Sequence, residues 1–149
     1  MTVRVQIEDF DVGAELEALG RADAGIGAVV SFLGLVRELA GAAPLVALEL
    51  EHYPGMTERE LEALEAEARR RWRLSGCLIV HRHGRLALGD RIVLVAVASP
   101  HRADAFAACQ FLIDWLKTRA TFWKREETAE GGRWVDARAE DDQAAAAWE

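Results

Sequence analysis

The fold is decided by one stretch, residues 91–117, which reads RIVLVAVASPHRADAFAACQFLIDWLK. Its first part is rich in valine and alanine and predicts a strand. Ser99 and Pro100 then predict the start of a helix, with Ser99 as the N-cap and Pro100 in the first turn. The helix is expected to run to about Lys117. Apolar residues at helical spacing form its expected buried stripe: Ala105, Phe106, Cys109, Ile113 and Leu116.

Further strands are expected around this unit. The patterns predict them at residues 3–7, 25–33, 45–53 and 77–83, on either side of a turn at Gly89–Asp90, and in a hairpin that turns at residues 130–132. The segment 25–33 is small and β-branched, which favours a buried strand. In the segment 45–53 we expect Val46, Leu48 and Leu50 on one face.

Two more helices are predicted before residue 91. Asp11 can cap a short helix that carries Val12, Leu16 and Leu19 on one face. After a turn at Pro54–Gly55, the pair Thr57 and Glu60 has the spacing of a capping box. The helix that follows carries an apolar stripe of Leu61, Leu64, Ala68 and Trp72. The acidic, alanine-rich residues 140–149 predict a helix or a frayed end.

Strands and helices are therefore interspersed without a regular βαβ alternation. This order predicts an α+β fold in a single domain spanning residues 1–149, with two main helices against an antiparallel or mixed sheet. No glycine-rich loop of the G-x-G-x-x-G or Walker type occurs in the sequence. A Rossmann or P-loop nucleotide-binding domain is thereby disfavoured.

Composition excludes several classes of protein. The net charge of −7 and the pI near 5.2 argue against a general nucleic-acid binder. The longest apolar run, residues 92–98, is too short to span a bilayer, and the start does not resemble a signal peptide. The two cysteines, Cys77 and Cys109, match neither a disulfide framework nor a metal site. We therefore expect buried thiols, no cofactor and a cytoplasmic location.

The stretch LKTRATFWKREE, residues 116–127, gathers cations around aromatic side chains in an acidic chain. Lys117 ends the predicted helix, where a cation also suits the helix dipole. Lys124 and Glu126 share one face of the next strand with Phe122. A lysine that is partly desolvated beside other cations can transfer protons or act as a nucleophile. A solvated basic surface explains the same residues equally well at this level.

Further cations stand at the ends of predicted elements. His101 and Arg102 open the long helix, where unpaired N–H groups attract anions, although a local ion pair would also explain them. Arg102 is disfavoured by the dipole at that end, which strengthens a functional interpretation. Arg37 follows a strand and a glycine and could clamp a phosphate or a carboxylate, or be an ordinary loop arginine.

The remaining histidines favour structural roles. His81 and His83 alternate on a strand, but no third metal ligand stands at a suitable spacing, so packing or surface roles are expected. His52 is expected to shape the turn before a helix. The sequence contains no Ser-His-Asp order, HExxH or C-x-x-C motif.

Taken together, the sequence resembles the large, catalytic subunit of molybdopterin synthase. The matching stretches are GAVVSFLGLVRE (27–38), LELEHYPGM (48–56), HRHGRLALGD (81–90), SPHRADAFAACQFLIDWLKTRATFWKRE (99–126) and GGRWVDAR (131–138). Thr121 departs from a usual proline and His83 from a usual aliphatic residue. The resemblance implies an α/β-hammerhead type of α+β fold and a homodimer.

The resemblance also implies a function. Each large subunit of this family binds a small ubiquitin-like sulfur-carrier subunit, which gives a heterotetramer. The carrier's Gly-Gly tail ends in a thiocarboxylate, whose sulfur passes to cyclic pyranopterin monophosphate (precursor Z). Two transfers, with opening of the cyclic phosphate, form the dithiolene of molybdopterin.

The implied site residues follow from the matching motifs. Lys117 and Lys124 stand where the family has its two active-site lysines, and Glu126 matches the acidic residue that closes the W-K-x-E motif. An anion-binding pocket is implied for Arg37, His101, Arg102 and Arg138. His101 and Arg102 lie one helix away from Lys117, too far to touch along it. The pocket would therefore be long or shared across a dimer contact.

Two other functions are compatible with these residues. A non-catalytic module could dock a sulfur-carrier tail without turning over the precursor. A small RNA binder is disfavoured by the acidic total and the scarcity of aromatic residues that could stack on bases.

Overall fold

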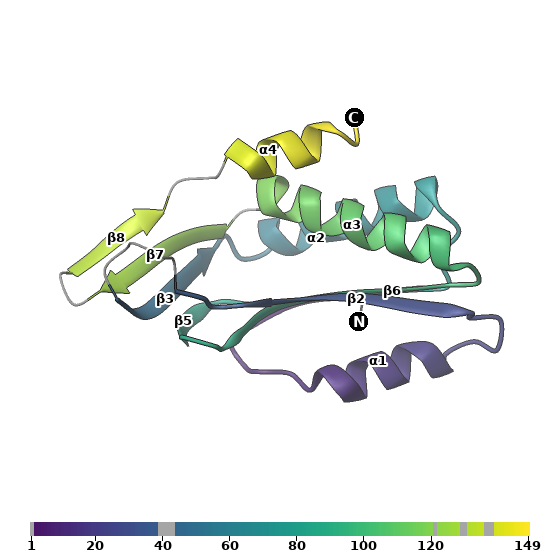
Figure 1. Cartoon of the computed structure of the whole chain (residues 1–149), viewed down its shortest axis with the longest axis horizontal. Helices are drawn as coiled ribbons and strands as arrows, with labels where there is room; N and C mark the ends of the chain where they lie inside the picture. The colour runs from purple at the N-terminus through teal and green to yellow at the C-terminus, as the bar shows by residue number, and fades with distance from the viewer. Residues whose placement is uncertain (1, 39–43, 121, 129–130, 136–138) are drawn as a thin grey trace.

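The computed structural model describes residues 2–38, 44–120, 122–128, 131–135 and 139–149. It confirms the α+β class, with two four-stranded sheets, of which the first has helices on both faces (Figure 1). The helices are α1 (Val12–Arg21), α2 (Met56–Arg71), α3 (Arg102–Arg119) and α4 (Ala139–Ala146). The strands are β1 (Val3–Gln6), β2 (Ala28–Leu35), β3 (Leu45–His52), β4 (Gly76–Arg82), β5 (Gly84–Ala87), β6 (Arg91–Ser99), β7 (Phe122–Thr128) and β8 (Gly131–Val135).

The first sheet is built around β6, in the order β1-β4-β6-β2. Alternate residues of β6 face opposite layers because side chains alternate along a strand. Val93, Val95 and Val97 pack into the core beneath α2 and α3, whereas Leu94 and Ala96 pack with α1. Figure 1 shows α1 on one side of this sheet and α2 and α3 on the other. The continuous apolar run of β6 is thus buried on both faces.

The second sheet has the order β5-β3-β7-β8 and extends from one end of the first. The expected hairpin forms it in part, because β7 pairs antiparallel with β8. The strands on either side of Gly89–Asp90 do not pair with each other: β5 joins β3, whereas β6 stays in the first sheet. The connection from β4 to β6 therefore crosses from one sheet to the other and back.

Two expected burial patterns are wrong. The segment predicted as a buried strand forms β2, which is an edge strand, so Phe32, Leu33 and Leu35 are exposed. In β3 a register shift lies between Leu45 and Ala47, which turns Val46 outward and leaves it 53 % exposed. A β-bulge of this kind inverts the facing of the residues that precede it.

The helix starts also differ from the sequence prediction. α3 begins at Arg102 with His101 as N-cap, because Ser99 completes β6 and its hydroxyl donates to the carbonyl of Arg73 at 2.7 Å. Gly55 rather than Thr57 caps α2, with a φ of 83° and its N–H donated to the carboxylate of Glu58.

The helical stripes are largely confirmed. Leu61, Leu64 and Ala68 are buried in α2, and the predicted residues of α3 are buried except Phe106, which is 62 % exposed. The helix predicted at Asp11 is also confirmed, since that side chain accepts a hydrogen bond from the N–H of Ala14 at 3.0 Å. Residues 139–146 form α4, which packs on α3, and the indole N–H of Trp115 donates to the carbonyl of Ala145 at 3.1 Å. In the described part of the chain no helix is long and apolar enough to cross a membrane.

Candidate functional site: a cavity that holds both lysines

A cavity of about 140 Å³ lies where the two sheets meet beneath the C-terminal end of α3. Its polar lining consists of Lys117, Lys124, His81 and Asp141, and its other walls are aliphatic or aromatic, including Leu50 and Phe122. These residues come from both sheets, α3 and α4. The cavity therefore forms only when segments that are far apart in the sequence, from β3 to α4, fold together.

Local structure brings the two lysines to this cavity from different directions. Lys117 lies in the last turn of α3, next to the buried Leu116. Lys124 follows Phe122 by two residues on β7, so both side chains lie on the face toward the cavity, as predicted. Trp123 points the other way and is 48 % exposed.

Lysine is used nowhere else in this chain. Of the 18 basic residues, 16 are arginine, and the two lysines are Lys117 and Lys124. Surface positions accept either cation, but only lysine supplies a compact ammonium that can also lose its proton. The presence of both lysines of the chain at this site is therefore a signal in the sequence that marks the site, and it does not depend on the spacing of any motif.

His81 is a cavity residue that sequence reasoning missed. It is 5 % exposed, and its ring stacks on that of Phe122 with centroids 3.7 Å apart. Burial, reinforced by the charges of Lys117 and Lys124, lowers the pKa of His81 to about 3. The sequence favoured a packing or surface role because no metal-ligand spacing was present, and only the tertiary structure shows that His81 lines the same cavity as the two lysines.

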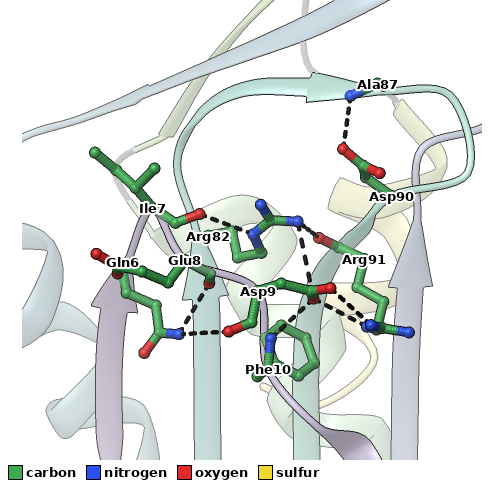
Figure 2. A network of polar contacts seen from close by, with 9 residues as sticks. All are labelled: Gln6, Ile7, Glu8, Asp9, Phe10, Arg82, Ala87, Asp90 and Arg91. Carbon is green, nitrogen blue, oxygen red and sulfur yellow. Dashed lines mark hydrogen bonds and ion pairs between the residues drawn. The ribbon is translucent and has the colours of Figure 1, made fainter.

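A polar network fixes the strand end beside His81 (Figure 2). The guanidinium of Arg82 donates to the carbonyls of Ile7 and Arg91, both at 3.0 Å, and lies 3.9 Å from the carboxylate of Asp9. Asp9 in turn accepts two hydrogen bonds from Arg91, at 2.9 and 2.6 Å. The bond from Arg91 lowers the pKa of Asp9. These contacts tie the segment after β1 to the ends of β4 and β6.

Asp141 is the second cavity residue that the sequence did not indicate. It lies in the first turn of α4, in the segment for which the sequence left a helix and a frayed end open. Because α4 packs on α3, Asp141 lines the cavity that holds the two lysines. An anion at this position offsets part of their positive charge.

Arg37 lies at the same end of the first sheet as the cavity. It follows β2, whose last residue, Leu35, is paired with Arg91, and the neighbouring Ile92 lines the cavity. Val36 is anchored by hydrogen bonds to the Gly89–Asp90 turn, at 2.9 and 2.8 Å. The Arg37 side chain itself is exposed.

His101 and Arg102 lie at the opposite end of α3, both exposed. They line a separate shallow depression together with Gly27 and Pro100. Gly27 is required there, because a Cβ would lie 2.3 Å from the carbonyl oxygen of Pro100. At 1.5 Å per residue, Arg102 and Lys117 are separated by about 22 Å along the helix. One copy of the chain therefore does not bring them together.

The other expected site residues have different surroundings. Glu126 lies opposite Arg133 in the β7–β8 hairpin and pairs with its guanidinium at 3.0 Å. Arg138 and Thr121 lie outside the described residues. Cys77 and Cys109 are buried free thiols whose pKa values desolvation raises to about 12 and about 11, which disfavours the nucleophilic thiolate. Among the described residues no group of three His, Cys, Asp or Glu side chains could hold a metal ion.

Known proteins resemble this chain along nearly its full length. The MoaE protein family model matches residues 5–119. The molybdopterin synthase catalytic subunit of Cereibacter sphaeroides is 53 % identical over 148 residues, which cover 99 % of this chain and 100 % of that protein. The corresponding protein of Ralstonia nicotianae is 54 % identical over 147 residues, 99 % of this chain and 84 % of its own.

Solved structures give the same result. The molybdopterin biosynthesis MoaE protein of Burkholderia ambifaria is 54 % identical, with a TM-score of 0.85 over 99 % of this chain and 97 % of its own. Molybdopterin synthase from Staphylococcus aureus is 34 % identical, with a TM-score of 0.85 over 91 % and 98 %. The match in sequence and in fold confirms the resemblance, and the chain belongs to the MoaE protein family.

Proposed function

We propose that this protein is the catalytic subunit of a molybdopterin synthase and acts as a sulfurtransferase. It would take sulfur from the C-terminal thiocarboxylate of a small ubiquitin-like carrier subunit and transfer it to cyclic pyranopterin monophosphate. The observation that carries the proposal is the meeting of Lys117 and Lys124 in one partly apolar cavity. Relatives that are more than half identical are named as this catalytic subunit. The two buried thiols suit the reducing cytoplasm that we propose as its location.

The chemistry of the cavity suits two anionic reactants. The thiocarboxylate sulfur bonds to the precursor, and water then attacks the carrier's terminal carbonyl, which releases the carrier as a carboxylate and leaves the sulfur on the pterin. Negative charge develops on the carbonyl oxygen during this hydrolysis, and an ammonium in a partly desolvated cavity stabilises such charge well. We assign this role to Lys117. Lys124 is assigned to proton transfer during phosphate opening and loss of water. The small volume of about 140 Å³ suits a narrow glycine tail better than a whole pterin.

Within the described residues, the cations expected to bind the substrate phosphate do not all lie at the cavity. Arg37 lies at the cavity end of the first sheet, whereas His101 and Arg102 lie beyond its other end. We propose that a second copy of the chain brings its own His101 and Arg102 to the cavity. The working assembly would then be a homodimer with one carrier on each copy, with Glu126 and Arg138 near the pocket as the resemblance implies.

Reconstitution tests the activity directly. The purified protein is mixed with thiocarboxylated carrier and cyclic pyranopterin monophosphate, and the dithiolene product is measured after oxidation to its fluorescent derivative. We expect product together with desulfurised carrier, and unmodified carrier serves as the control. Carrier binding without product would instead identify a docking module. Salt-dependent RNA binding without product would identify an RNA-binding protein.

Mixed dimers test the shared site. A copy carrying Lys117→Ala is combined with a copy carrying Arg102→Ala, and the heterodimer is purified through two different tags. If each pocket takes Lys117 from one copy and Arg102 from the other, one pocket of the heterodimer contains both intact residues and the other contains neither. About half of the wild-type activity is then expected, although each homodimer is nearly inactive. If each site were contained in one chain, both pockets of the heterodimer would be damaged and no activity would return.

A further inference from the structure

The orientation of the His81 ring is determined by its neighbours. Nδ1 lies 2.7 Å from the carbonyl oxygen of Arg82. A carbonyl oxygen can only accept, so Nδ1 carries the ring proton. In the neutral imidazole Nε2 then presents a lone pair. The residue is almost wholly buried and lines the cavity, which makes the cavity its route of access.

The ring is also held rigidly. Phe122 stacks on it with an interplanar angle of 17°. Arg82, whose carbonyl anchors Nδ1, is itself fixed by the contacts of its guanidinium with Ile7, Arg91 and Asp9 (Figure 2). A group held on two sides in this way loses little entropy when it forms a further hydrogen bond.

The cavity keeps this acceptor uncharged. Desolvation is the largest cause of the lowered pKa of His81, and Lys117 contributes more than Lys124 or His52 among the neighbouring charges. At neutral pH the imidazole therefore remains a neutral acceptor beside two cationic side chains. Protonated, it would repel both of them.

We propose that His81 is a positioning residue for the sulfur transfer, in which Nε2 accepts one hydrogen of the Lys117 ammonium and directs the others toward the anionic reactants. This inference rests on the proposed function of the lysine cavity and adds the group that orients its cation. An ammonium has three donors on a flexible stem, so one fixed acceptor removes most of its freedom. The effect belongs to the chemical step, because the ammonium must point at charge that develops only there.

Two substitutions test the Nε2 acceptor of His81 independently of its aromatic ring. His81→Phe keeps an aromatic ring against Phe122 and removes Nε2, whereas His81→Gln keeps an acceptor and removes the ring. We expect His81→Phe to lower kcat by about tenfold to a hundredfold with little change in KM, and His81→Gln to retain more activity than His81→Phe. His83→Phe is the matched control, because His83 contacts His52 and does not line the cavity. A higher KM at unchanged kcat, or greater activity in His81→Phe than in His81→Gln, would overturn the proposal.

A second measurement does not depend on turnover. The chain has two lysines, so acylation of each amine by a water-soluble ester can be followed by peptide mass spectrometry. We expect Lys117 to react roughly tenfold faster in His81→Phe than in the wild type and to be unchanged in His83→Phe. Unchanged Lys117 reactivity would refute the role of His81 even if the enzyme is active. If the wild type forms no dithiolene but Lys117 still reacts faster in His81→Phe than in the wild type, only the proposed function is refuted.

Discussion

Replacing Lys117 with alanine is expected to slow dithiolene formation by about a hundredfold to a thousandfold, the usual cost of removing a group that stabilises charge in a transition state. The side chain is half-buried in the last turn of α3, so its truncation leaves the helix and the core in place. The rate is measured in single turnover with thiocarboxylated carrier in excess, which separates sulfur transfer from product release.

The control for this substitution is Arg21→Ala. Arg21 is likewise the cation in the last turn of a helix, but it is exposed on α1, away from the cavity. Its loss removes a similar interaction with the helix dipole and should leave the rate unchanged. Thermal denaturation shows whether the Lys117→Ala protein is folded. A folded Lys117→Ala protein that makes product at near the wild-type rate would remove Lys117 from the mechanism.

Acidification is expected to destabilise the folded protein through His81. Its pKa is about 3 in the fold, against 6.5 for an unperturbed histidine, because burial and the charges of Lys117, Lys124 and His52 oppose protonation. Between these two values the unfolded chain binds a proton that the native state does not bind. The free energy of unfolding therefore falls as pH decreases below 6.5, and His81 has no such effect above that pH.

The size of the effect is measurable by urea denaturation at pH 7 and pH 5. Between these values the titration of His81 should lower the free energy of unfolding by about 2 kcal/mol. His81→Phe should lose this part of the pH dependence. His83→Phe should keep it and lose only the smaller contribution of His83, whose pKa burial also lowers. Equal pH dependence in the wild type and in His81→Phe would show that His81 is protonated as readily in the fold as in the unfolded chain.

Periodicity predicted most elements because each depends on neighbouring residues. The stripe of α2, the cap at Asp11 and the alternation of β7 follow from spacings of two to four residues. The wrong predictions concern strands whose burial or pairing depends on segments that are distant in the sequence. β2 is apolar but lies at a sheet edge, and β5 leaves its neighbour β6 to pair with β3. Strand order is set by contacts between segments far apart in the chain, and a local pattern does not contain it.

The features of the candidate site were likewise predictable from the sequence only in part. The sequence by itself determined that Lys117 lies near the end of a helix, that Lys124 shares a strand face with Phe122, and that Arg37, His101 and Arg102 lie at element ends. Only the tertiary structure decided that both lysines meet in one cavity, that His81 and Asp141 join them, and that His101 and Arg102 lie at the far end of α3. The reason is physical. Local spacing fixes the face on which a side chain lies, but the packing of α3 on the first sheet and of α4 on α3 fixes what that face meets.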